Sequence, residues 1–254
     1  MCGQKGGECM VRSEGAEPLF VTGIPYFAGG MEAALEVTLR AYGEGRALAV
    51  FTPGATVAAR AVRDGSLRDL LSRADLLLPD GKGVTLAARA CGAGRLSAVA
   101  GIDFAERLLA AMEGAGARVF LYGGKPGVAE RAAVRLGERY PRLIFATADG
   151  YGRDPRERIA AFRPHAVCVG LGVPRQEVWI AENKARTGGV LMGIGGALDV
   201  WAGDKKRAPA PLRRAGLEWA WRTVCEPHRL PRLFPLPRYY ITCLRFRQNA
   251  KKKK

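Results

Sequence analysis

The sequence predicts an α/β fold: a Rossmann-like, mainly parallel sheet with flanking helices, followed by a basic C-terminal helical appendage. Three observations support this. Short apolar runs alternate with helical patterns along most of the 254 residues, and four of these runs end in glycine-rich turns that lead into a helix. After Gly203 the pattern changes to prolines and aromatic residues among arginines. Alternating strands and crossover helices are typical of a doubly wound parallel sheet.

The chain divides into three expected parts. Residues 1–17 are glycine-rich and polar, so we expect them to be disordered, and they lack the apolar stretch of a signal peptide. Residues 18–203 form the expected α/β core, and residues 204–254 the appendage. No apolar run approaches the roughly 20 residues that span a bilayer. These features predict a cytoplasmic protein.

In the first half of the core, strands and helices follow from changes in hydrophobic period. Residues 31–42 carry apolar side chains at helical spacing, and 47–51 form an apolar run that ends in Thr52-Pro53-Gly54. A third run, 76–78, leads through Asp80-Gly81 into the next helical pattern. The expected elements are strands over 19–23, 47–51 and 76–78 and helices over 31–42, 55–73, 83–91 and 102–113.

The second half repeats this pattern. Apolar runs that begin at Val119, Leu143, Val167 and Val190 predict four further strands, and helices are expected over 127–140, over 155–162 and from Pro174 onward. Proline is favoured in the first turn of a helix, which supports the last of these. In the appendage, Pro209 opens one continuous expected helix, and the prolines after it are expected to break up the remaining segment.

Charge is distributed unevenly along the chain. The whole protein carries a formal charge of +16, of which residues 204–254 carry +12. A nearly neutral core with a basic appendage indicates an anionic partner for the appendage. Nucleic acid, an anionic membrane and a plain solvated face all fit the charge. Aromatic residues beside the arginines favour a membrane interface, and Lys251–Lys254 alone reads as a solubilising tail or an expression remnant.

Several kinds of site are not indicated. The six cysteines include no C-x-x-C pair, and there are only two histidines, so we expect no metal site and no histidine-based triad. The glycine-rich turns match neither the G-x-G-x-x-G nor the P-loop spacing, which argues against hydride transfer. We therefore expect no cofactor.

The strand ends still indicate an anionic ligand, because glycines there let backbone N–H groups approach a phosphate. The glycines in question are Gly123, Gly124, Gly172, Gly195 and Gly196.

Polar residues at these strand ends supply the remaining candidates. Asp80 follows an apolar run and adjoins Gly81, where a carboxylate can project into the crevice, although a helix N-cap explains the same position. Asp103 and Asp199 carry the same ambiguity. In the block 174–177, the amide of Gln176 can hold a sugar hydroxyl and a neighbouring arginine can offset phosphate charge.

Nine blocks of residues, taken in order, carry a family resemblance. They are Pro79-Asp80-Gly81, Val99-Ala100-Gly101-Ile102-Asp103, Phe120-Leu121-Tyr122-Gly123-Gly124-Lys125-Pro126-Gly127, Gly150-Tyr151, Gly170-Leu171-Gly172-Val173-Pro174-Arg175-Gln176-Glu177, Gly195-Gly196-Ala197-Leu198-Asp199, Lys206-Arg207-Ala208-Pro209, Gly216-Leu217-Glu218-Trp219, and Arg222 with Glu226-Pro227. With this order and spacing, the sequence resembles the WecG/TagA/CpsF glycosyltransferases over about residues 19–233.

The resemblance implies an activity. Such enzymes transfer an N-acetylmannosamine-type sugar from UDP to a polyprenyl-diphosphate-linked N-acetylglucosamine, as peripheral proteins on the inner face of the cell membrane, in wall or surface polysaccharide synthesis. It implies Asp80 as the general base, Thr52 and Gln176 in the sugar and acceptor pocket, and Arg207 and Arg222 in an appendage that closes over the diphosphate. A single inverting displacement without a metal ion is then expected, and a homo-oligomer is left open.

The sequence departs from the family pattern at two places. Gly54-Ala55-Thr56 stands where the family usually has an asparagine-containing triplet, and Ala98 stands where it often has arginine, with Arg95 nearby. Two other functions therefore stay open. One is a nucleic-acid-binding module that uses the basic appendage, and the other is a nucleotide-sugar-binding protein without activity.

Overall fold

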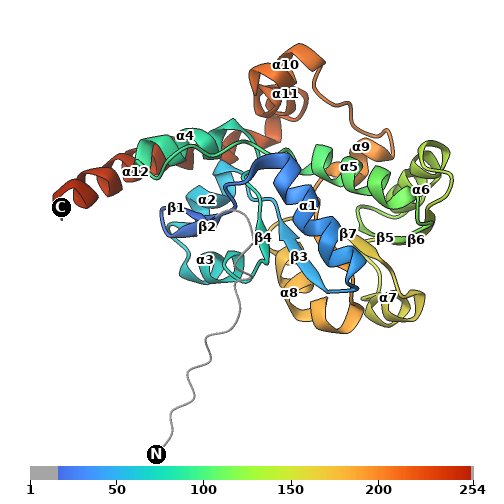
Figure 1. The fold of residues 1–254 in the computed structure, drawn as a ribbon. Helices are drawn as coiled ribbons and strands as arrows, with labels where there is room; N and C mark the ends of the chain where they lie inside the picture. The colour runs from blue at the N-terminus through green and yellow to red at the C-terminus, as the bar shows by residue number, and fades with distance from the viewer. Residues whose placement is uncertain (1–16, 253–254) are drawn as a thin grey trace, which may run out of the picture.

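The structure, a computed structural model, describes residues 17–252 and consists of a parallel sheet between two layers of helices (Figure 1). The expected disorder of residues 1–17 falls almost entirely outside this range. The sheet has the strand order β4-β3-β8-β7-β5-β6, and all neighbouring strands run parallel. Its strands are β3 (Leu48–Phe51), β4 (Leu76–Leu77), β5 (Arg118–Gly123), β6 (Ile144–Ala148), β7 (Ala166–Gly170) and β8 (Val190–Gly193). The predicted fold class is confirmed.

Both faces of the sheet are buried, which explains why its strands read as continuous apolar runs. In β3, Leu48 and Val50 pack into one core, whereas Ala49 and Phe51 pack into the other, because successive side chains point to opposite faces. The first core lies under α1 (Gly30–Gly43), α5 (Gly101–Glu113), α6 (Val128–Arg139) and α9 (Ala197–Trp201). The second lies under α2 (Ala55–Ala61), α3 (Gly65–Leu71), α4 (Lys82–Cys91), α7 (Arg156–Phe162) and α8 (Arg175–Thr187).

Two N-terminal expectations need correction. The helix expected over 55–73 is two helices, α2 and α3, because Asp64 caps the second one by accepting a hydrogen bond from the Leu67 N–H at 3.1 Å. The strand expected over 19–23 is the first arm of a hairpin, in which β1 (Leu19–Val21) pairs antiparallel with β2 (Ile24–Tyr26). Gly23 forms the turn at a φ of +83°.

The appendage differs more from its prediction. The single helix expected after Pro209 is interrupted at Gly216, whose φ of +74° ends α10 (Ala210–Ala215) before α11 (Glu218–Cys225) begins. A short 3₁₀ helix, η1 (Pro227–Arg232), follows. The later part of the segment expected to be broken by prolines is instead helix α12 (Pro235–Lys252), because its two prolines, Pro235 and Pro237, lie in the first turn, where no intrahelical N–H is needed.

Helix α12 attaches the appendage to the core. It runs beside α4 and also contacts α2 (Figure 1), and its Tyr239 and Cys243 are buried in the second core. Helices α10 and α11 lie above the carboxyl ends of the strands. Among the residues that the structure describes, no helix has the length and apolar character needed to cross a membrane.

Candidate active site

Two cavities lie between the carboxyl ends of the strands and the appendage. The first, of about 840 Å³, lies beyond β5 and β7, where Gly124 and Gly170 line it; we call it the glycine cavity. The second, of about 590 Å³, lies beyond β3, β4 and β8 and contains Asp80; we call it the Asp80 cavity. Arg222 of α11 lines both cavities, so a ligand in one lies next to a ligand in the other.

Asp80 sits on the wall of its cavity. It follows β4, forms an isolated β-bridge with Gly54, and accepts a hydrogen bond from the Gly101 N–H at 3.4 Å. Burial raises the pKa of Asp80 to about 6. Arg222 and the Gly101 N–H oppose this shift, whereas the carboxylates of Glu218 and Asp103 add to it. A carboxyl group with a pKa near neutrality is suited to act as a general base.

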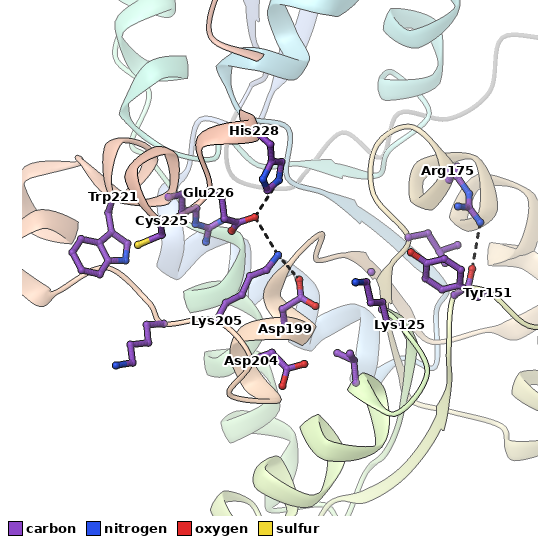
Figure 2. Close-up of a pocket in the computed structure, with 17 residues that line it drawn as sticks. Lys125, Tyr151, Arg175, Asp199, Asp204, Lys205, Trp221, Cys225, Glu226 and His228 are labelled. Carbon is purple, nitrogen blue, oxygen red and sulfur yellow. Dashed lines mark hydrogen bonds and ion pairs between the residues drawn. The ribbon is translucent and has the colours of Figure 1, made fainter. Parts of the chain in front are cut away.

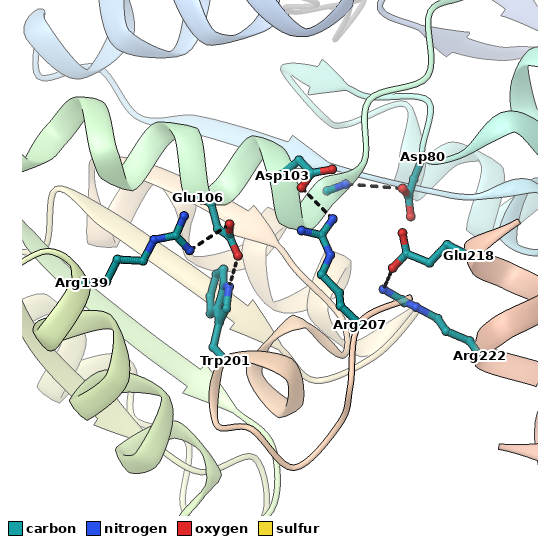
Figure 3. A network of polar contacts seen from close by, with 9 residues as sticks. Asp80, Asp103, Glu106, Arg139, Trp201, Arg207, Glu218 and Arg222 are labelled. Carbon is teal, nitrogen blue, oxygen red and sulfur yellow. Dashed lines mark hydrogen bonds and ion pairs between the residues drawn. The ribbon is translucent and has the colours of Figure 1, made fainter. Parts of the chain in front are cut away.

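Each of the two arginines expected to bind a diphosphate forms an ion pair with a carboxylate of the protein. Arg222 forms an ion pair with Glu218 at 2.7 Å within α11, and Arg207 forms one with Asp103 at 2.6 Å (Figure 3). The carboxylate of Glu218 points toward that of Asp80 in the same view. Arg222 lines both cavities, whereas Arg207, which is paired with Asp103, lines neither.

The two polar residues expected in the sugar pocket have different positions. Thr52 lines the Asp80 cavity and donates its hydroxyl to the Gly193 carbonyl at 3.1 Å. Gln176 is only 3% exposed and lines neither cavity. Its Oε1 accepts from the N–H groups of Gly172 at 3.2 Å and Gly195 at 3.1 Å, so it joins two turns.

Buried beside it, Glu177 accepts from Gln176 Nε2 at 2.9 Å, and burial raises the pKa of Glu177. In this structure Gln176 thus orders the strand ends rather than facing a ligand. Its direct contact with sugar or acceptor stays a prediction.

The glycine N–H groups are largely committed within the protein. Those of Gly172 and Gly195 bind Gln176, and that of Gly124 donates to the Gly170 carbonyl at 3.3 Å. Gly123 serves packing, because an added Cβ would lie 2.5 Å from the Gly170 oxygen. In this structure the N–H groups of Gly124, Gly172 and Gly195 thus have partners within the protein, and their direct contact with a phosphate stays a prediction. Gly196 lines neither cavity. In the sequence it lies between Ile194, which lines the Asp80 cavity, and Asp199, which lines the glycine cavity.

The glycine cavity offers charges and rings instead. Its cations are Lys125, Arg175, Lys205, Lys206 and Arg222; its acids are Asp199, Asp204 and Glu226; its rings include Tyr151 and Trp221. Lys205 Nζ contacts Asp199 at 2.8 Å and Glu226 at 3.4 Å (Figure 2). Within residues 17–252, the Trp221 Nε1 is shielded from solvent and has no hydrogen-bond partner.

Sequence reasoning did not assign Lys125, Tyr151 or Trp221 to a ligand. For Lys125 and Tyr151, a position just after the end of a strand is the sequence feature that could have indicated a ligand contact.

The structure also shows what surrounds the two positions at which the sequence departs from the family pattern. Ala98 lines the Asp80 cavity, but Arg95 is exposed and does not. Two arginines of the appendage, Arg213 and Arg232, line that cavity instead. Gly54 lines it too, and a Cβ there would lie 3.4 Å from the Asp80 carbonyl oxygen. In the described part of the chain, no group of three or more histidine, cysteine or acidic residues is placed to hold a metal ion.

Comparisons with known proteins give a consistent result. The profile of the glycosyl transferase WecG/TagA/CpsF family matches residues 19–253. The chain is 32% identical over 234 residues to the N-acetylglucosaminyldiphosphoundecaprenol N-acetyl-beta-D-mannosaminyltransferase of Bacillus subtilis, covering 90% of this chain and 91% of the relative. Proteins of the same name from Bacillus spizizenii and Staphylococcus aureus (strain NCTC 8325 / PS 47) are 33% identical. They match 80% and 73% of this chain, and 81% and 75% of the relatives.

Proposed function

This chain belongs to the WecG/TagA/CpsF family of glycosyltransferases, and from this premise we propose the reaction that it catalyses. It transfers an N-acetylmannosamine-type sugar from a UDP-sugar to a polyprenyl-diphosphate-linked N-acetylglucosamine, with inversion and without a metal ion. The names of its relatives give this sugar and this acceptor. The observation that carries the proposal is Asp80, a carboxylate with a pKa near 6 on a cavity wall, across from an arginine that lines both cavities.

The chemistry uses Asp80 and Arg222. Asp80 takes the proton of the acceptor hydroxyl while the hydroxyl oxygen attacks the anomeric carbon of the donor. The bond from that carbon to the β-phosphate oxygen breaks, and UDP leaves with its electron pair. A positioned base contributes typically ~10²–10⁴-fold to such a step. Arg222 faces the charge that develops on the departing diphosphate.

The glycine cavity suits the nucleotide of the donor. Tyr151 and Trp221 offer ring faces for the base, and the carboxylate of Asp199 can accept hydrogen bonds from hydroxyl groups. Lys125 and Arg175 add positive charge for the diphosphate. With the nucleotide here, the anomeric carbon lies toward Arg222 and the Asp80 cavity.

The Asp80 cavity suits the acceptor. Its size is adequate for a sugar, and the appendage supplies Arg213 and Arg232 for the diphosphate of the lipid carrier. These two arginines offset the missing cation at Ala98. Arg207, held by Asp103, would support this wall rather than contact the phosphates.

The appendage also carries the features of a peripheral membrane surface. Trp219, Phe234 and Phe246 are 54%, 72% and 49% exposed, and they alternate with arginines such as Arg238 and Arg245. Exposed rings among cations favour the headgroup region of an anionic membrane. The acceptor lipid lies in that membrane, so we infer that the protein acts on its inner, cytoplasmic face.

The test is a turnover assay with a panel of UDP-sugars and a lipid-diphosphate-linked N-acetylglucosamine. We expect UDP release with UDP-N-acetylmannosamine in the presence of EDTA, and a loss of at least roughly 10²-fold in Asp80→Asn. Asp69→Asn is the matched control, because it removes an exposed carboxylate of α3 that lines neither cavity. Tight UDP binding without any transfer would favour an inactive binding protein. Steeply salt-dependent binding of nucleic acid without UDP affinity would favour the other alternative.

A further inference from the structure

Lys82 connects the core to the appendage at the first turn of α4, two residues after Asp80. Its Nζ donates to the carbonyl oxygens of Arg214 at 3.2 Å and Ala215 at 2.9 Å, at the end of α10. Its aliphatic chain packs on Gly216, where an added Cβ would lie 2.1 Å from Lys82 Cδ. The contact joins residues that are more than 130 positions apart in sequence.

This contact is chemically favourable. The last carbonyl groups of a helix have no intrahelical partner and carry partial negative charge, so a lysine ammonium there satisfies them and complements the dipole. A second appendage contact reaches the next residue of α4, since Tyr240 of α12 donates its hydroxyl to the Gly83 carbonyl at 3.1 Å. The turn that follows Asp80 is therefore fixed from two sides.

The consequence for the site follows from the short connection between α10 and α11. Only Gly216 and Leu217 separate Ala215 from Glu218, the first residue of α11. Helix α11 carries both Glu218, which points toward Asp80, and Arg222, which lines both cavities. Fixing the end of α10 therefore also fixes these two side chains.

We propose that Lys82 is a positioning residue for the transfer reaction. It holds the end of α10 on the first turn of α4 and so keeps Glu218 and Arg222 over Asp80. The proposal rests on the proposed function, because it assumes that Asp80 and Arg222 act on the substrates. It assigns no substrate contact to Lys82.

The pH dependence of the reaction reports on this role. The charged or titratable groups that act on Asp80 or share its cavity come from six elements: Tyr26 of β2, Lys82 of α4, Asp103 of α5, Arg213 of α10, Glu218 and Arg222 of α11, and Arg232 of η1. Burial is the main reason that the pKa of Asp80 lies near 6, and residues of α11 line the cavity that contains Asp80. If the appendage lifts, water reaches Asp80 and its pKa falls toward the ordinary 3.8.

The experiment compares Lys82→Met, Lys82→Arg and the control Arg89→Met, which removes an exposed cation from the last turn of the same helix. Each full-length variant is assayed for kcat/KM against pH with UDP-N-acetylmannosamine and the lipid acceptor. Hydrogen exchange of residues 210–226 is measured alongside. Gly216→Ala serves as a second way to disrupt the contact between Lys82 and the end of α10, because the added methyl group would crowd the Lys82 side chain.

We expect Lys82→Met to lower kcat/KM by roughly 10- to 100-fold, to move the acid limb below pH 6 and to speed exchange in 210–226. Gly216→Ala should reproduce these changes. Lys82→Arg keeps a donor for the same carbonyls and should stay within about threefold of the wild type, and Arg89→Met should match it.

Two results would overturn the proposal. One is wild-type activity and exchange in Lys82→Met. The other is lost activity with an unchanged acid limb and unchanged exchange, which would make Lys82 a direct ligand contact. Failure of the proposed function looks different: the wild type itself would show no turnover, while the exchange of 210–226 would still report whether Lys82 holds α10.

Discussion

At the scale of single residues, Asp80 combines two properties that oppose each other. Its burial makes it a better base near neutral pH, but burial of a carboxyl group also disfavours the ionised form that catalysis requires. The nearby carboxylates of Asp103 and Glu218 add to this cost, whereas Arg222 and the Gly101 N–H reduce it. The residue that carries the chemistry is therefore expected to lower the stability of the fold.

This cost can be measured. The pKa of Asp80 is raised in the folded state, so its contribution to stability is fully present below pH 3.8 and is lost as the pH rises through 6. We expect Asp80→Asn to unfold at a temperature a few degrees higher than the wild type at pH 7.5, because it cannot ionise. At pH 4 the difference should shrink toward zero.

Thermal unfolding of both proteins across this pH range checks the expectation. Glu36→Gln, an exposed substitution on α1, is the matched control and should change little at either pH. Equal melting temperatures for Asp80→Asn and wild type at pH 7.5 would show that the folded state does not disfavour the Asp80 carboxylate.

At the scale of elements, the loops after β7 and β8 are held together by one amide. Gln176 sits in the first turn of α8 and accepts from Gly172 and Gly195, one glycine from each loop. Its Nε2 reaches Glu177 and packs so close to Gly193 that an added Cβ there would lie 2.8 Å away. These contacts explain why a glutamine and a small residue occur together at these strand ends.

Replacing this amide should affect stability as well as activity. In Gln176→Leu the two glycine N–H groups and Glu177 lose their partners, and an unsatisfied buried group costs about 1–3 kcal/mol. We expect urea unfolding to show a loss of stability of that order, together with reduced kcat/KM. Gln248→Leu, an exposed glutamine on α12, is the control. Full stability with a raised KM alone would instead place Gln176 against the substrate.

At the scale of the whole molecule, charge and exposed apolar surface gather in the appendage. Residues 204–254 carry +12 of the formal charge of +16, and the exposed rings of Trp219, Phe234 and Phe246 lie in the same segment. The substrate cavities open between this segment and the sheet. A membrane that binds the appendage therefore presents its lipid-linked sugar close to Asp80.

Vesicle binding tests this arrangement. The double variant Phe234→Ser with Phe246→Ser should bind vesicles of anionic lipid at least roughly tenfold more weakly, since it removes two apolar side chains from the interface. Val134→Ser, which removes an exposed apolar side chain from α6, should bind like the wild type. High salt should weaken the binding of all three proteins. A role for this surface would be contradicted if the double variant bound neutral and anionic vesicles equally well and with the same affinity as the wild type.

Much of the architecture was predictable from local patterns. Apolar runs such as 119–122 and 167–169 read as buried strands because both faces of the sheet are covered, and the helices between them have clear periodicity. The errors occurred where one residue overrides a pattern. Asp64 divides one expected helix, Gly216 divides another, and Pro235 starts a helix rather than preventing one.

By itself, the sequence determined the fold class, the family and the position of Asp80 at a strand end, because these depend on residue order and hydrophobic period. Only the tertiary structure decided that Gln176 faces inward, that Arg207 is held by Asp103 and that Lys82 meets the end of α10. Such contacts join residues from distant parts of the chain. Their partners are set by packing in three dimensions, which no local pattern encodes.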